Sequence, residues 1–177
     1  MKDRNPPHII FLDFDGVLNT EKYQAELYAN KEPRSDKYGP LFDPEAVENL
    51  RMILDVVPDA QIVISSSWKL EGLQRMKNMW KDRGLPGQVA GITPNNIEMD
   101  WNINLDEVSD YSSFVGRGKE IRQWLSDNTP EGCRYVIFDD LPDYLPEQEE
   151  HLVTTIPYKG ISHDDALMAI SILEGKR

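Results

Sequence analysis

The stretch FLDFDGVLN, residues 11–19, ends an apolar run in two aspartates and then turns at a glycine. Successive side chains of a strand point to opposite faces, so Asp13 and Asp15 can share one face while Phe14 points into the core. Two carboxylates this close repel each other and raise each other's pKa. The pair therefore predicts a compensating feature, which is a divalent cation, a shared proton or full solvation.

The rest of the chain alternates strands and helices. Apolar runs of strand length occur at 8–14, 60–68, 87–93, 133–140 and 151–156. Segments with helical spacing of apolar residues or with helix capping signals lie between them at 42–59, 70–83 and 116–128, and a last one follows at 162–177. This alternation predicts an α/β fold, a Rossmann-like parallel sheet in three layers with helices on both faces.

Polar side chains follow three of the predicted strands at the point where each strand ends. Asp13 and Asp15 follow the first, the serines at 65–67 follow the second, and Asp139 and Asp140 follow the fourth. Ligands of open parallel sheets bind beyond the carboxyl ends of the strands. The sequence thus predicts one functional edge that is fed by three strands.

Composition limits the remaining possibilities. The 177 residues, of which 40% are hydrophobic, suit one domain over 1–177. The net charge of -12 disfavours an extended nucleic-acid groove but permits one anionic group at a local positive site. Cys133 is the one cysteine, which excludes an intramolecular disulfide and favours a reducing compartment. No long apolar segment is present, so we expect a soluble, cytoplasmic protein without membrane association.

The order of these motifs resembles the haloacid dehalogenase (HAD) superfamily of phosphoryl-transfer enzymes. The likeness covers residues 8 to about 144 and rests on DFDGVLN, a strand ending in SSS, a lysine that opens a helix, and a strand ending in DD. More narrowly, FLDFDGVLN, IVISSSWK, RGKEIRQWL and VIFDD are similar to the small HAD modules of Swiss Army Knife RNA repair proteins. The resemblance implies a HAD-like fold with two small cap insertions, at about 20–43 and 93–116.

The resemblance also implies the chemistry of the acidic residues. Asp13 would be the nucleophile that forms an aspartyl-phosphate, and Asp15 would act first as general acid and then as general base. Neighbouring acids would raise the pKa of Asp15 for this task. Mg²⁺ would be held by Asp13, by the carbonyl oxygen of Asp15 and by Asp140.

Other residues would support the phosphate and the metal. The resemblance implies that Ser65 or Ser66 hydrogen-bonds a phosphate oxygen, that Gly16 lets backbone N–H groups face the phosphate, and that Lys119 balances the negative charge. The alternatives are a serine that only caps a helix, a calcium-binding loop or a solvated turn in place of a catalytic DFDG segment, and a solvated surface lysine beside Arg117. Trp68, after the serines, either covers a substrate or packs beneath the turn, and we favour packing.

The late acid pair is divided between two roles. Strand alternation lets only one of the two point toward the metal, and the resemblance to family members with a DD pair implies that Asp140 is the ligand, with Asp139 as an outer-sphere partner. Asp143 is expected to support the site or to cap a turn. The alternative is that these acids simply lie at a helix N-terminus, which attracts negative charge.

These observations predict a Mg²⁺-dependent phosphoric monoester hydrolase. Small caps suit a phosphate on a bulky group, such as a nucleic acid end. Aromatic residues of the two insertions could stack on a base, namely Tyr23, Tyr28, Tyr38, Trp101, Tyr111 and Phe114. Two alternatives remain open: a phosphoacceptor that does not hydrolyse, and a catalytically silent HAD scaffold that binds a partner.

Overall fold

A computed structural model describes residues 6–95, 116–129 and 131–176. The second predicted insertion, with Trp101, Tyr111 and Phe114, lies almost wholly outside the described residues. Within those residues, no helix is long and apolar enough to cross a membrane.

The core of the molecule is a five-stranded sheet in which every neighbouring pair is parallel. Its order is β5-β4-β1-β6-β7, so the first strand lies in the centre. The strands are β1 (His8–Leu12), β4 (Gln61–Ile64), β5 (Val89–Ile92), β6 (Arg134–Asp139) and β7 (Leu152–Thr154). All five follow from the predicted apolar runs.

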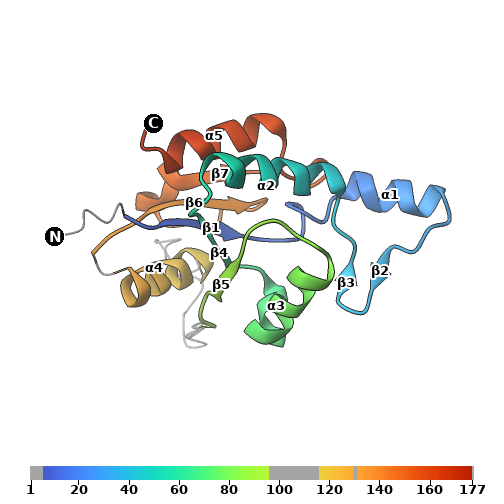
Figure 1. Cartoon of the computed structure of the whole chain (residues 1–177), viewed down its shortest axis with the longest axis horizontal. Helices are drawn as coiled ribbons and strands as arrows, with labels where there is room; N and C mark the ends of the chain where they lie inside the picture. Colours follow the sequence, from blue (N-terminus) through green and yellow to red (C-terminus); the bar gives the residue numbers. More distant parts are fainter. Residues whose placement is uncertain (1–5, 96–115, 130, 177) are drawn as a thin grey trace, which may run out of the picture.

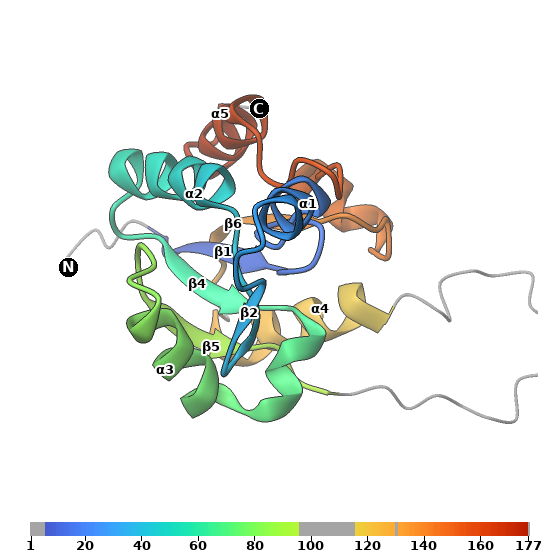
Figure 2. The same cartoon turned by 90° about the vertical axis from the view of Figure 1, so that its right-hand side faces the viewer.

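Helices cover both faces of this sheet, which confirms the predicted three-layer α/β fold. α2 (Pro44–Val56) and α5 (His163–Leu173) lie on one side, while α4 (Gly116–Asn128) lies on the other (Figure 1). α3 (Leu73–Asp82) packs beside β5 (Figure 2). Alternation along β1 divides the core, because Ile10 and Leu12 join the cluster with α2 and α5, whereas Ile9 and Phe11 join the cluster with α4.

The predicted helix starts are present as caps. The Asp43 side chain accepts a hydrogen bond from the backbone N–H of Glu45, and Pro44 occupies the first turn of α2. At α5, Ser162 and Asp165 form a reciprocal capping box. These local signals fix where both helices enter the layer above the sheet.

The first insertion has more regular structure than the sequence pattern suggested. It contains α1 (Glu21–Ala29) and a short hairpin of β2 (Ser35–Asp36) and β3 (Gly39–Pro40). Arg83, at the end of α3, donates two hydrogen bonds to Asp36 and one to the carbonyl of Gly39. The hairpin is therefore fastened to the body of the molecule.

The acidic segment PEQEEH has regular structure. Residues Pro146–His151 form a 3₁₀ helix, η3, in which Gln148 is buried. The Gln148 side chain accepts a hydrogen bond from the N–H of Leu145 and donates one to the carbonyl of Gly118. Besides its exposed acidic side chains, this segment therefore makes a buried polar contact that supports α4.

Candidate active site

The register of the sheet brings the three predicted polar motifs together. Leu12 pairs with Ile64 of β4 and with Phe138 of β6, so the residues that follow these three come to the same edge. The chain continues this pairing past the strands, since the N–H of Asp13 donates to Phe138 and the N–H of Ser65 donates to Leu12. The three predicted motifs therefore lie together at one edge of the sheet, as expected from the sequence.

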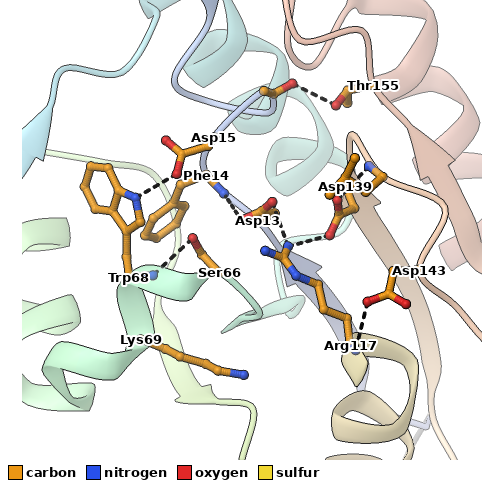
Figure 3. A network of polar contacts seen from close by, with 12 residues as sticks. Asp13, Phe14, Asp15, Ser66, Trp68, Lys69, Arg117, Asp139, Asp143 and Thr155 are labelled. Atoms are coloured by element: carbon orange, nitrogen blue, oxygen red, sulfur yellow. Dashed lines mark hydrogen bonds and ion pairs between the residues drawn. The ribbon is translucent and has the colours of Figure 1, made fainter. Parts of the chain in front are cut away.

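Asp13 is buried at this edge and faces α4. Its Oδ1 accepts a hydrogen bond from the N–H of Phe14 at 2.8 Å, and its Oδ2 lies 2.7 Å from Nη1 of Arg117 (Figure 3). Burial raises the pKa of Asp13 to about 6, although Arg117 opposes the shift. Arg117 alone therefore leaves the ionised carboxylate incompletely compensated.

Asp139 is fully buried, and both of its oxygens are occupied. Oδ1 accepts from the N–H of Leu141 at 2.8 Å, and Oδ2 accepts from Arg117 and from the Tyr144 hydroxyl, each at 2.5 Å. Burial and the Asp139 carboxylate raise the pKa of Tyr144, so the tyrosine stays a donor. These contacts favour the predicted supporting role for Asp139.

Asp140 lies on the more open side of the same pair. Its carboxylate, with those of Asp13 and Asp139, forms a cluster whose ligand atoms all lie within 4.8 Å of one another. Burial and the Asp139 carboxylate raise the pKa of Asp140. As Asp139 is engaged by the protein, Asp140 is the better placed of the two to bind a ligand.

Gly16 serves the site by its lack of a side chain. Its φ is +73°, and a Cβ built there would lie 2.7 Å from Cγ of Asp140. Its N–H donates to the carbonyl of Asn19, and its own carbonyl accepts from the Thr155 hydroxyl. The turn itself uses the Gly16 N–H, and the expectation that other backbone N–H groups of this turn face the phosphate stays a prediction.

Arg117, in the first turn of α4, is the cation that the described ion pairs bring to Asp13 and Asp139. Burial disfavours the charged guanidinium, but the two carboxylates outweigh this effect and raise its pKa. Lys119, the residue predicted for this role, follows two positions later, about 200° around the helix axis. The described ion pairs thus support Arg117 for the balancing charge, and the role expected of Lys119 stays a prediction.

Asp143 fixes the start of α4. Its carboxylate accepts from the N–H of Arg117 at 3.4 Å, and its carbonyl accepts from the N–H of Gly118 at 3.1 Å. These bonds satisfy amide groups that a helix N-terminus leaves unpaired. Asp143 thus holds the backbone that carries Arg117, in keeping with the predicted supporting role.

Asp15 has a different environment from Asp13. It is exposed and lies outside the cluster of the other three carboxylates. Oδ1 accepts from the side-chain amide of Asn19 at 2.7 Å, and Oδ2 accepts from the indole N–H of Trp68 at 3.0 Å (Figure 3). Two neutral donors therefore hold this carboxyl.

The structure separates the two candidate serines. Ser66 Oγ accepts from the N–H of Trp68 and caps the 3₁₀ helix η1 (Ser67–Glu71). Ser65 Oγ is buried and has no hydrogen-bond partner among the described residues. A buried hydroxyl without a partner is costly unless a ligand satisfies it, so Ser65 is the better candidate for phosphate binding.

A second buried ion pair, unexpected from the sequence, stands behind the serines. Nζ of Lys69 pairs with Glu120 of α4, donates to the Thr93 hydroxyl at 2.8 Å and donates to the carbonyl of Pro94 at 3.2 Å. Burial lowers the pKa of Lys69 despite Glu120. This lysine joins the ends of β4 and β5 to α4 and so fixes the serines relative to Arg117.

A cavity of about 340 Å³ opens between these elements. Ser65, Lys69, Arg117, Glu120 and Asp143 are among its lining residues. It holds both the unpartnered hydroxyl and the arginine of the site, which are the groups that an oxyanion would bind.

The carboxylate cluster fits a hard divalent cation. Three carboxylates face one arginine, and burial raises the pKa of Asp13 and of Asp140, so the charges are not balanced by the protein alone. Carboxylate oxygens are the ligands that Mg²⁺ prefers. Asp140 is better placed to bind it than Asp139, because the protein engages both oxygens of Asp139. Asp13 completes the group of ligand atoms, although Phe14 and Arg117 already contact its oxygens.

The parallel sheet with an aspartate cluster at its carboxyl edge defines a HAD-type domain. A family model described as the HAD domain in Swiss Army Knife RNA repair proteins matches residues 9–166, and the chain belongs to this family. Searches of curated proteins and of solved structures returned no significant match. Membership of a HAD family points to a phosphatase-type hydrolase.

Proposed function

We propose that this chain is a metal-dependent phosphomonoester hydrolase that uses Asp13 as its nucleophile. The observation that carries the proposal is the cluster of Asp13, Asp139 and Asp140 beside Arg117 and the unpartnered Ser65 hydroxyl. The cluster supplies a nucleophile and a cation site, while Ser65 and Arg117 supply donors for an oxyanion. Family membership supports the same class of reaction.

The reaction proceeds in two balanced steps. The Asp13 carboxylate attacks phosphorus, the bond from phosphorus to the leaving oxygen breaks, and the Asp15 carboxyl gives its proton to that oxygen. Water then attacks the aspartyl-phosphate, transfers a proton to Asp15, and releases phosphate with the Asp13 carboxylate restored. Asp15 is exposed, as a group that exchanges protons with substrate and water must be.

The protein supplies part of the charge compensation along this path. Arg117 pairs with Asp13, and Ser65 donates to a phosphate oxygen in the 340 Å³ cavity. Mg²⁺, held by Asp13, Asp140 and the carbonyl oxygen of Asp15, would neutralise the phosphate and so allow an anionic nucleophile to approach it. Asp139, Tyr144 and Asp143 keep the donors in place.

For the substrate, we propose a phosphate presented on a bulky group, with a nucleic acid terminus as the first candidate. The family description supports RNA repair. The net charge of -12 favours contact with one terminal phosphate over contact with a long backbone. Such a substrate needs only one local site for an anion, which Arg117, the Ser65 hydroxyl and the bound cation would provide together.

The test is phosphate release by the purified protein, with Mg²⁺ and with EDTA. The substrates are an aryl phosphate and oligonucleotides that carry a 5′- or a 3′-phosphate, and Asp13→Asn is the control. We expect release that needs Mg²⁺, is lost in the variant and favours one oligonucleotide end. Release from none of the substrates would contradict the proposal and favour a non-hydrolytic phosphoacceptor or a silent scaffold.

A further inference from the structure

We infer that Trp68 is a positioning residue that holds the Asp15 carboxyl for proton transfer to the leaving group. This inference rests on the proposed function, because it gives Trp68 a role in the acid step assigned to Asp15. Its basis is the 3.0 Å hydrogen bond from the indole Nε1 to Oδ2 of Asp15, which joins residues 53 positions apart in the chain.

The indole ring is itself fixed on several sides. It packs edge-on against Phe14 at a centroid distance of 5.4 Å and lies 5.7 Å from Phe42. Gly39 of the β3 strand approaches so closely that a Cβ there would lie 2.9 Å from Cη2 of the indole. A donor this constrained can orient a carboxyl that is otherwise exposed on a turn.

The environment of the hairpin explains why Gly39 stays in place. Arg83 binds both Asp36 and the Gly39 carbonyl, and its guanidinium also lies over the rings of Phe42 and Trp68, at 4.5 and 5.8 Å. The chain of contacts therefore runs from α3 through Arg83 and the hairpin to Trp68 and ends at Asp15. Packing alone, the role expected from the sequence, would not need the indole N–H to point at the carboxyl.

The Asp15 carboxyl takes part in both steps, but kcat/KM reports only the first, in which the nature of the leaving group decides how much the orientation matters. In the transfer to Asp13, a poor leaving group such as an alkoxide needs the Asp15 proton, whereas 4-nitrophenolate leaves readily without it. Misplacing the carboxyl should therefore slow the cleavage of alkyl phosphates and leave that of aryl phosphates nearly unchanged. A loss of packing or of folded protein would slow both substrates equally.

The chain offers a matched control in Trp80. Trp80 is buried, whereas Trp68 is partly buried, and the ring of Trp80 also packs against Phe14, stacked instead of edge-on. Its indole N–H donates to the carbonyl of Pro86 instead of to Asp15. Trp80→Phe and Trp68→Phe thus remove the same atoms and comparable hydrogen bonds. They differ in the acceptor of the lost hydrogen bond, which is Asp15 for Trp68 and the Pro86 carbonyl for Trp80.

The experiment measures kcat/KM for 4-nitrophenyl phosphate and for an alkyl phosphate, because this ratio reports the steps up to the first phosphoryl transfer. We expect Trp68→Phe to lose about 10-fold or more on the alkyl phosphate and less than about 3-fold on the aryl phosphate. Trp68→Tyr is measured alongside in case Phe at this position impairs folding. Tyr also lacks the indole N–H, so we expect the same difference between the two substrates. In the Asp15→Asn background, Trp68→Phe should have no further effect on the alkyl substrate.

Equal losses on both substrates, or the same discrimination in Trp80→Phe, would overturn the inference while the proposed function stands. Lack of turnover by the wild-type protein would overturn both. The geometry has a readout that does not need activity. In a ¹⁵N–¹H spectrum, the indole resonance that disappears in Trp68→Phe should shift in Asp15→Asn, and an unchanged resonance would contradict the contact.

Discussion

The two aspartates of the DFDG motif are two positions apart, yet they occupy opposite halves of the site. Around Asp13 the site is buried and charged, with Arg117, Asp139 and Tyr144 in direct contact with one another or with Asp13. Around Asp15 it is exposed and held by neutral donors. The difference teaches that one short motif can place two carboxyls in separate environments.

The largest expected effect comes from removing the nucleophile in the buried half. Asp13→Asn keeps the shape of the side chain but cannot form an aspartyl-phosphate, so turnover should fall by about 10³-fold or more. Steady-state phosphate release with each substrate checks this. Substantial residual turnover would mean that Asp13 does not attack phosphorus.

Asp15→Asn should remove the acid function of the exposed half of the site while the fold stays intact. The carboxyl is exposed, so the free energy of unfolding should change by no more than about 0.5 kcal/mol. The loss of general acid catalysis should lower kcat/KM for an alkyl phosphate by about 10²-fold. If chemical denaturation showed a large loss of stability instead, the two halves would not be independent.

Arg117→Ala should cost both activity and stability, since it leaves Asp13 and Asp139 buried without their cation. We expect about 10²-fold lower turnover and a free energy of unfolding lower by about 3 kcal/mol. Lys119→Ala provides the comparison, and we expect it to lose less of both. A larger loss of turnover in Lys119→Ala would restore the assignment made from the sequence.

Substitutions of Asp139 and Asp140, at the end of β6, should separate metal binding from support of the fold. Mg²⁺ at a hundred times its dissociation constant should stabilise the wild-type protein by about 2.7 kcal/mol in thermal unfolding. Asp140→Asn should remove this gain with little change in the metal-free stability. Asp139→Asn should destabilise the metal-free protein, and the reverse pattern would exchange their roles.

The smallest effects concern the two serines. Ser65→Ala removes a hydroxyl that has no partner among the described residues, so we expect unchanged stability and KM higher by roughly 10-fold. Ser66→Ala removes a cap and should lower the free energy of unfolding by about 1 kcal/mol, with a smaller change in KM. Kinetics and urea unfolding of both variants decide between them.

Much of the fold could be predicted from the sequence, because the apolar runs, Asp43, Ser162 and Asp165 are local signals that agree with one another. The edge where Asp13, Ser65 and Asp139 meet followed from the same pattern. The first insertion was harder, since the contacts that fix its hairpin come from Arg83 of a distant helix. Polar contacts between residues far apart in the chain produce no periodic pattern in the sequence, so they could not be predicted from it.

The sequence itself contains a signal that distinguishes Arg117 from Lys119, which is their spacing from the buried residues of the helix. Arg117 lies four residues before Ile121 and seven before Trp124, so a helix places it on the buried face. Lys119 falls about 160° from Ile121, on the other side. The family pattern of a lysine outweighed this signal, whereas the helical geometry pointed to the arginine.

The buried pair of Lys69 and Glu120 and the indole contact of Trp68 had no such signal. Each joins residues more than 50 positions apart, and each depends on side-chain directions that are set by packing. The three consecutive serines were ambiguous for a related reason, since only the actual turn decides which hydroxyl caps and which stays unpaired.

The central claim is that the Asp13 carboxylate receives the phosphoryl group. The most direct test is an acid quench during turnover of a phosphate-labelled substrate, followed by mass spectrometry of the peptides. We predict label on Asp13 that is removed by hydroxylamine, as for an acyl-phosphate, and absent in Asp13→Asn. Turnover with no labelled protein, or label on another residue, would contradict the account.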